Sequence, residues 1–251
     1  MSNSSENATF WEHLDELRSR LLRMLLGVAL FTVATFMCKE QLFNVVLAPR
    51  NSDFISYRLL DIPAFSVHLI NTALTEQFMV HMRTAVYVGL LLASPYIIYQ
   101  LFAFVAPALY VNERRYAIWV GGAAYVMFIL GTMLNYFLIF PLTLRFLATY
   151  QVSTDVTNML TLQSYIDTLI SMSFMMGIIS ELPVVCVIMG RMGIINDKLM
   201  TAYRKHAIVA ILIVAAIVTP TTDVFTLLIV SLPIWMLYEA SIWIVKVVNC
   251  K

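Results

Sequence analysis

The chain has 251 residues, of which 61% are hydrophobic and 12% are charged. A soluble domain carries about 25% charged residues, so this chain lacks the polar surface that a water-soluble fold needs. The composition indicates an integral membrane protein, and the net charge of +1 argues against nucleic acid as the main partner.

The N-terminal stretch joins an amphipathic pattern to an apolar run. Apolar side chains recur there at spacings of three and four, as on one face of a helix: Phe10, Leu14, Leu17 and Leu21. This pattern predicts an interfacial helix within a cytoplasmic segment over residues 1–20. The following run, 21–37, has roughly the 17 residues that a membrane crossing needs, so it is the first predicted span.

A mixed segment separates this span from the next two. Residues 38–77 contain charges and prolines and are predicted to form a loop outside the membrane with two short helices, one before Pro49 and one over 64–74. The second span is predicted over 78–104. The third is predicted over 116–140, ending near Pro141 because proline lacks the N–H that a helix interior needs.

Three further apolar runs complete a predicted bundle over residues 21–245. They cover 168–189, 207–219 and 224–238, and a cytoplasmic tail follows at 246–251. The run at 207–219 is short, because about 13 residues at 1.5 Å each span roughly 20 Å of a core about 30 Å thick. We therefore predict one all-α membrane domain over the whole chain, with six transmembrane helices.

The distribution of basic residues predicts the orientation. Six spans place both termini on one side, and eleven Lys and Arg residues fall on that side: Arg18, Arg20, Arg23, Arg114, Arg115, Arg191, Lys198, Arg204, Lys205, Lys246 and Lys251. Five fall on the other: Lys39, Arg50, Arg58, Arg83 and Arg145. Because basic loops stay inside, both termini are predicted to be cytoplasmic.

Glu181 is the most informative single residue, because it lies inside the fourth apolar run. A charge at the centre of a bilayer costs about 2.5 to 3.5 kcal/mol on insertion scales, so acids there usually face a cavity or a partner. The alternative is a neutral acid that is hydrogen-bonded inside the bundle. We favour a polar point that faces a cavity or a partner helix.

The other charges have simpler interpretations. The run from Glu12 to Arg20 is typical of a solvated helix face with local ion pairs, and spacing alone favours this for Glu16 and Arg18. Glu113 lies in a short basic loop beside two arginines. No nucleophile elbow, phosphate loop or zinc motif is found, and the three cysteines have no ligand spacing, so we predict neither an enzyme nor a cofactor.

Several motifs taken together resemble the TatC family, the multispanning receptor subunit of the twin-arginine protein translocase. They are His13-Leu-Asp-Glu-Leu-Arg-Ser-Arg-Leu21, Phe102-Ala-Phe-Val-Ala-Pro-Ala-Leu-Tyr110, Glu113-Arg-Arg, Phe137-Leu-Ile-Phe-Pro141 and Glu181-Leu-Pro183. The resemblance runs from about residue 12 to about 245 and implies a concave six-span bundle in the bacterial cytoplasmic (inner) membrane.

The resemblance also implies a function and its residues. TatC-like proteins bind signal peptides with two consecutive arginines, work in an oligomeric complex with TatB-like and TatA-like subunits, and export folded proteins on the proton-motive force. By motif position, Glu16 and Glu113 resemble the carboxylates that receive the arginines, with Arg18 and Phe104 in support. Candidates for structural or partner contacts are Pro49, Tyr136, Phe137, Thr219 and Asp223, and Glu181 resembles the polar residue of the concave face.

Two points limit the resemblance. The turn Thr219-Pro-Thr-Thr-Asp223 is one residue longer than the family often has, and Leu227 stands where a Gln is common.

A proton-coupled transporter of small solutes that uses Glu181 as a relay is the alternative function. It would require more polar residues facing each other across spans than the sequence offers.

Overall fold

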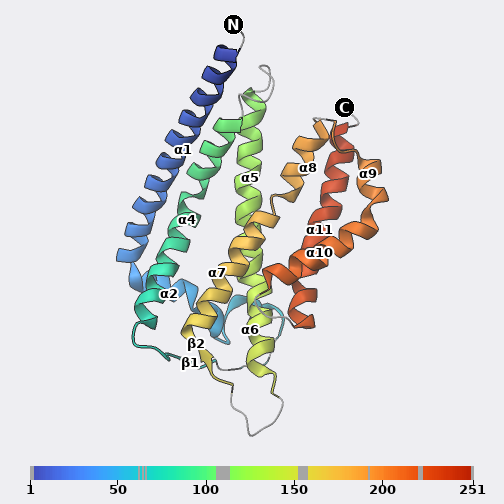
Figure 1. Ribbon diagram of the computed structural model, residues 1–251. Helices are drawn as coiled ribbons and strands as arrows, with labels where there is room; N and C mark the ends of the chain where they lie inside the picture. Colours follow the sequence, from blue (N-terminus) through green and yellow to red (C-terminus); the bar gives the residue numbers. More distant parts are fainter. Residues whose placement is uncertain are drawn as a thin grey trace. The chain divides into compact units, whose positions relative to one another are not determined.

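The protein is described here from a computed structural model, which covers residues 3–61, 63, 65, 67–105, 114–151, 158–191, 193–219 and 223–249 (Figure 1). Side chains are described from residue 14 in the first helix and from residue 120 after the gap at 106–113.

Helices make up most of the described chain, as predicted. In order they are α1 (Asn3–Met37), α2 (Lys39–Val46), η1 (Ala48–Arg50), α3 (Ile55–Leu59), α4 (Glu76–Val105), α5 (Arg114–Leu134), η4 (Asn135–Ile139), α6 (Phe140–Thr149), α7 (Leu162–Ile179), α8 (Leu182–Arg191), α9 (Asp197–Ala202), α10 (Arg204–Val218) and α11 (Val224–Asn249). Two short strands, β1 (Leu69–Ile70) and β2 (Leu160–Thr161), pair in parallel. The all-helical class is confirmed.

Five stretches of the described chain are long and apolar enough to cross a membrane. They are Leu14–Met37, Glu76–Leu101, Val120–Thr149, Leu162–Arg191 and Val224–Val247. Helix α10 has 15 residues, or about 22 Å, which is short of a core about 30 Å thick. The count of six spans and the cytoplasmic termini therefore stay predictions.

The chain divides into two compact units. The first combines Met1–Leu42 with His81–Tyr125, and the second combines Phe43–Val80 with Val126–Lys251. The organisation as one membrane domain stays a prediction. Helix α1 is continuous from Asn3 to Met37, so the predicted interfacial helix and the first span form one element.

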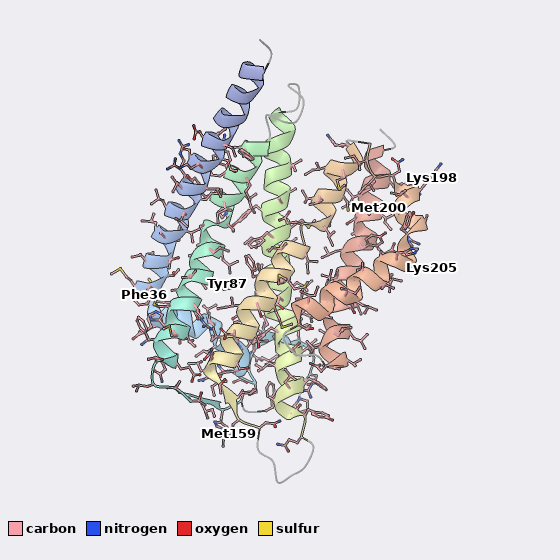
Figure 2. All side chains as sticks on the ribbon, viewed as in Figure 1. Phe36, Tyr87, Met159, Lys198, Met200 and Lys205 are labelled. Atoms are coloured by element: carbon pink, nitrogen blue, oxygen red, sulfur yellow. The ribbon has the colours of Figure 1, made fainter. Side chains whose placement is uncertain are left out.

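In the first unit, α1 and α4 lie side by side and antiparallel (Figure 1). Arg20 contacts Gln100 near one end of the pair. Near the other end, the ring of Phe36, labelled in Figure 2, stacks on His81 with centroids 4.2 Å apart and planes 11° apart. Residue numbers rise along α1 while they fall along α4, which fixes the antiparallel direction.

Glycine allows the two helix backbones to approach closely. A Cβ at Gly89 of α4 would lie 2.6 Å from Oγ1 and 2.7 Å from the backbone nitrogen of Thr32 on α1. One turn away, the hydroxyl of Thr35 donates to the carbonyl of Ala85 at 2.9 Å. Because lipid tails are as apolar as leucine, helices in a membrane associate through such close packing and through hydrogen bonds.

The second unit has an apolar core built from η4, α7, α10 and α11. Its buried members are Ile139, Met172, Met176, Ile211, Ala215, Val218, Val230 and Ile234. Glycine again allows close contact beside this core, since a Cβ at Gly131 would lie 2.6 Å from the carbonyl oxygen of Met176. The adjoining helices α8 and α11 pack closely, with Cys186 and Val245 buried between them (Figure 1).

The third predicted span does not end at Pro141, so that boundary is wrong. A π-helical turn, η4, links α5 to α6, and the helix continues to Thr149. Within it the N–H of Phe140 donates to the carbonyl of Asn135, five residues back. Pro141 then falls in the first turn of α6, where a missing N–H is tolerated.

The loop before α4 is only partly as predicted. The short helix before Pro49 is confirmed as α2, whereas the described residues of 64–74 contain no helix. Leu69 and Ile70 instead pair with β2. The N–H groups of Thr72 and Ala73 donate to the carboxylate of Glu76, at 2.7 and 3.1 Å, so they are satisfied outside a helix.

Candidate functional site

Glu16 and Arg20 form an ion pair one helical turn apart on α1. Both Nε and Nη2 of Arg20 donate to the same oxygen, Oε1 of Glu16, at 3.0 and 2.5 Å. The Glu16 side chain is 40% exposed and that of Arg20 is 20% exposed. The second carboxylate oxygen, Oε2, accepts no hydrogen bond from the described residues, so it remains available to a ligand.

A buried amide on α4 holds the other side of Arg20. Oε1 of Gln100 accepts from Nη1 of Arg20 at 3.3 Å, and Nε2 of Gln100 donates to the hydroxyl of Tyr96 at 3.0 Å. Gln100 is 7% exposed. Four side chains therefore form one hydrogen-bonded chain from Glu16 across the contact between α1 and α4, which we call the Glu16 chain: Glu16, Arg20, Gln100 and Tyr96.

Phe104 lies on the same side of α4 as the Glu16 chain, whereas Arg18 does not lie on the side of α1 that carries Glu16. Phe104 is half-buried and follows Gln100 by four residues, a spacing that places both on one helix face. Arg18 is exposed and two residues from Glu16, and residues at that spacing face different sides. Glu113 lies outside the described residues, so its distance from Glu16 stays a prediction.

Glu181, in the second unit, lies where a long apolar helix is interrupted. Helix α7 ends at Ile179 and α8 begins at Leu182, within the apolar stretch Leu162–Arg191. Pro183 has no N–H to donate to the preceding turn, which favours this break. Glu181 is half-buried, and its Oε1 is buried without a hydrogen-bond partner among the described residues. A buried acceptor without a partner is suited to a donor from outside this chain.

Pro49 helps to hold the loop before α4 together through its carbonyl group. The hydroxyl of Tyr57 lies 2.9 Å from the carbonyl oxygen of Pro49 and 3.1 Å from that of Pro141. Tyr57 is 1% exposed, and burial raises the pKa of its hydroxyl, which therefore stays protonated and able to donate. This arrangement gives Pro49 a structural role.

Tyr136 and Phe137 join the same loop to the π-helical turn. The hydroxyl of Tyr136 donates to the carbonyl of Val45 at 2.6 Å. The ring of Phe137 stacks on Phe54 with centroids 5.8 Å apart, and its carbonyl accepts from the hydroxyl of Ser56. These contacts are structural, so neither residue needs a ligand to explain it.

Thr219 and Asp223 close the ends of two helices. The hydroxyl of Thr219 donates to the carbonyl of Ala215 at 3.0 Å at the end of α10. Oδ2 of Asp223 accepts from the N–H of Thr226 at 2.7 Å, a hydrogen bond of the kind that caps a helix start. Residues 220–222 lie outside the described residues. Leu227 packs against the apolar core of the second unit, in keeping with its lack of polar groups.

Sequence reasoning missed Arg20, Gln100 and Tyr96 as parts of the site. The spacing of four between Glu16 and Arg20 was a usable signal, because residues so spaced are neighbours on a helix. Gln100 and Tyr96 share that spacing with each other, but nothing in the sequence places them beside α1. The described residues contain no cluster of three or more His, Cys, Asp or Glu side chains that could hold a metal ion.

Five long apolar stretches among the described residues indicate a multi-pass membrane protein. The chain matches the family described as Sec-independent protein translocase protein (TatC) over residues 12–233. It therefore belongs to the TatC family, which serves twin-arginine translocation as a translocase receptor rather than as an enzyme.

Individual relatives cover almost the whole chain. The Sec-independent protein translocase protein TatC of Deinococcus radiodurans is 34% identical over 242 residues, which are 96% of this chain and 87% of the relative. TatCy of Bacillus subtilis is 29% identical over 235 residues, which are 94% of this chain and 87% of the relative. A crystal structure titled twin arginine translocase receptor TatC is 30% identical, with a TM-score of 0.78, and covers 94% of this chain and 99% of that one.

Proposed function

We propose that this chain is the signal-peptide receptor and core subunit of a twin-arginine translocation complex. It binds signal peptides that carry two consecutive arginines and recruits TatB-like and TatA-like single-span subunits. The complex then exports folded proteins on the proton-motive force. Membership of the TatC family supports this proposal, as does the similarity to a structure titled as a twin-arginine translocase receptor.

One observation carries the arginine site: Oε2 of Glu16 accepts no hydrogen bond from the described residues. A guanidinium group binds a carboxylate through two parallel hydrogen bonds, which a lysine ammonium cannot reproduce. Glu16 is half-exposed and offers Oε2, while Arg20 occupies Oε1. We assign the second arginine to Glu113. Phe104 supplies an apolar wall that strengthens these ion pairs by excluding water, because a fully exposed pair contributes about 0.2 to 1 kcal/mol.

The distribution of basic residues supports a place in the bacterial inner membrane with both termini inside. Eleven Lys and Arg residues fall on the side assigned to the cytoplasm and five on the other. Glu16 and Glu113 then lie on the side from which a newly made signal peptide arrives.

The small-solute transporter is not favoured. A proton relay through Glu181 needs a second titratable group within hydrogen-bonding reach, and its buried Oε1 has no partner among the described residues. We assign Glu181 to contact with a partner subunit instead.

A crosslinking assay with a twin-arginine signal peptide tests the proposed function. We expect Glu16→Ala and Glu113→Ala each to weaken crosslinking several-fold, and the corresponding Asp variants to weaken it less because they keep the charge. Asp15→Ala is the matched control, because Asp15 is exposed beside Glu16 on the same helix. Crosslinking at the wild-type level in the double alanine variant would remove the site assignment.

A further inference from the structure

We propose that Arg20 and Gln100 are positioning residues that orient the Glu16 carboxylate toward one arginine of the signal peptide. This inference rests on the proposed function and adds to it the groups that make the site selective for a guanidinium. It starts from the Glu16 chain, in which a charged pair on α1 is fixed to a buried amide on α4.

The geometry at Glu16 leaves one carboxylate edge occupied and the other open. Two N–H groups of Arg20 converge on Oε1, and Oε2 accepts no hydrogen bond from the described residues. A glutamate without such a partner samples many rotamers, and binding must then pay the entropy of ordering it. Arg20 removes much of that freedom before the ligand arrives, because a carboxylate held by two N–H groups points in one direction.

Gln100 fixes Arg20 in turn. A guanidinium carries five N–H donors, and Arg20 directs two to Glu16 and one to the buried amide oxygen of Gln100. The amide nitrogen of Gln100 donates to Tyr96, which sets which end of the amide faces Arg20. Gln100 belongs to the part of α4 that packs on α1, so its position depends on the helix contact and not on the ligand.

Displacement of Arg20 by the ligand is the competing interpretation, in which Arg20 blocks the site. The structure favours positioning for two reasons. No described residue donates to the oxygen that a ligand needs, and removing Arg20 would leave the buried Gln100 acceptor without its donor. The Glu16–Arg20 pair is also neutral as a unit, so attraction of the ligand depends on the direction of Oε2 more than on net charge.

This arrangement predicts a loss of selectivity as well as of affinity. A mobile carboxylate acts as a point charge, which a lysine satisfies as well as an arginine, whereas an oriented carboxylate favours the planar fork of a guanidinium. Variants at Arg20 or Gln100 should therefore bring the affinities for an Arg-Arg and a Lys-Lys peptide closer together. Damage to the fold alone would lower both affinities and leave their ratio unchanged.

The test measures binding of fluorescent signal peptides to the full-length chain in lipid nanodiscs. One peptide carries Arg-Arg and its match carries Lys-Lys. We expect Arg20→Gln and Gln100→Leu each to weaken Arg-Arg binding about two- to fivefold, a change of the size that one partly exposed charged interaction gives. The ratio of the two affinities should fall in both variants. Arg23→Gln is the matched control, because Arg23 is exposed on the same helix, and it should match the wild type.

Three outcomes separate this inference from the proposed function. If Glu16→Ala weakens Arg-Arg binding while Arg20→Gln and Gln100→Leu leave affinity and ratio at the wild-type level, positioning is wrong and the receptor site stands. Tighter binding by Arg20→Gln would show instead that Arg20 blocks the site. If the Glu16→Ala variant binds the Arg-Arg peptide as tightly as the wild type does, the proposed arginine site is wrong, and the positioning inference is wrong with it.

Discussion

The carboxylate of Glu76 accepts the backbone N–H of Gln163, 87 positions along the chain, at 2.9 Å. Its other oxygen accepts from the N–H and the hydroxyl of Thr72 and from the N–H of Ala73. One acidic side chain thus joins the loop before α4 to the first turn of α7. Both contacts lie within the second unit.

We expect Glu76→Gln to lower the thermal stability of the second unit. A glutamine amide has one oxygen, so its NH₂ group would replace one carboxylate oxygen of Glu76. At least one backbone N–H that donates to Glu76 in the wild type would then lose its acceptor. The loss of thermal stability is measured as the temperature at which a thiol-reactive dye labels the buried Cys186. The background for this assay carries Cys38→Ser and Cys250→Ser, so that Cys186 is the one remaining thiol. Glu40→Gln, at an exposed position, should label as the background does. Equal labelling by Glu76→Gln and the background would contradict the joining role.

We expect Gly89→Ala to weaken the contact between α1 and α4. The added Cβ would lie 2.6 to 2.8 Å from atoms of Thr32, two of which are backbone atoms that cannot rotate away. Overpacking of this kind costs about 1 to 3 kcal/mol, measurable by thermal unfolding in detergent. Gly122→Ala is the control within the same unit, because its Cβ would meet no described atom within 4 Å. That control should be neutral or stabilising by up to about 1 kcal/mol, because alanine favours helix.

The buried pair Asn135 and Ser173 should show coupled stability effects. Nδ2 of Asn135 donates to Oγ of Ser173 at 2.7 Å, and the two residues are 0% and 3% exposed. Ser173→Ala leaves the Asn135 donor without this partner and should destabilise the protein by about 0.5 to 2 kcal/mol. Asn135→Leu in the same chain should recover part of that loss. A double-mutant cycle measures the coupling, and strictly additive effects would show that the hydrogen bond does not contribute.

Substitutions at Glu181 should separate insertion from assembly. Glu181→Gln keeps the shape and a polar acceptor, so we expect normal membrane insertion and normal complex size on native gels. Glu181→Lys places a charge within an apolar stretch at a cost of about 2.5 to 3.5 kcal/mol and replaces an acceptor by a donor, so partner assembly should fail. Glu40→Lys, at an exposed position outside the spans, is the charge-matched control. A complex of normal size with Lys at 181 would count against a partner contact.

Hydropathy located the apolar segments well because the bilayer imposes length and composition on each one separately. The second predicted span, 78–104, nearly coincides with α4, and the fourth was located through its apolar run. Local rules were less successful where the backbone had alternatives. Pro141 is expected to end a helix, but it falls in the first turn of α6, directly after a π-helical turn. In the described part of 64–74, Leu69 and Ile70 pair with β2, and Glu76 accepts the N–H groups of Thr72 and Ala73.

The candidate site divides in the same way. The spacing of Glu16 and Arg20 makes them neighbours on any helix, so their ion pair was accessible from the sequence. The contribution of Gln100 was not, because 80 positions separate it from Arg20 and nothing local specifies which α4 residue meets that arginine. The close approach at Gly89 and the antiparallel register of the two helices bring them together.

The sequence by itself determined that this is a helical membrane protein, which segments are apolar enough to cross a bilayer, and which acids stand out from them. Those properties follow from the transfer of each segment between water and lipid, which is additive along the chain. The tertiary structure alone decided which oxygen of Glu16 accepts no hydrogen bond from the described residues, and which amide fixes Arg20. Those properties depend on distances between residues that are remote in sequence, and packing between helices sets such distances.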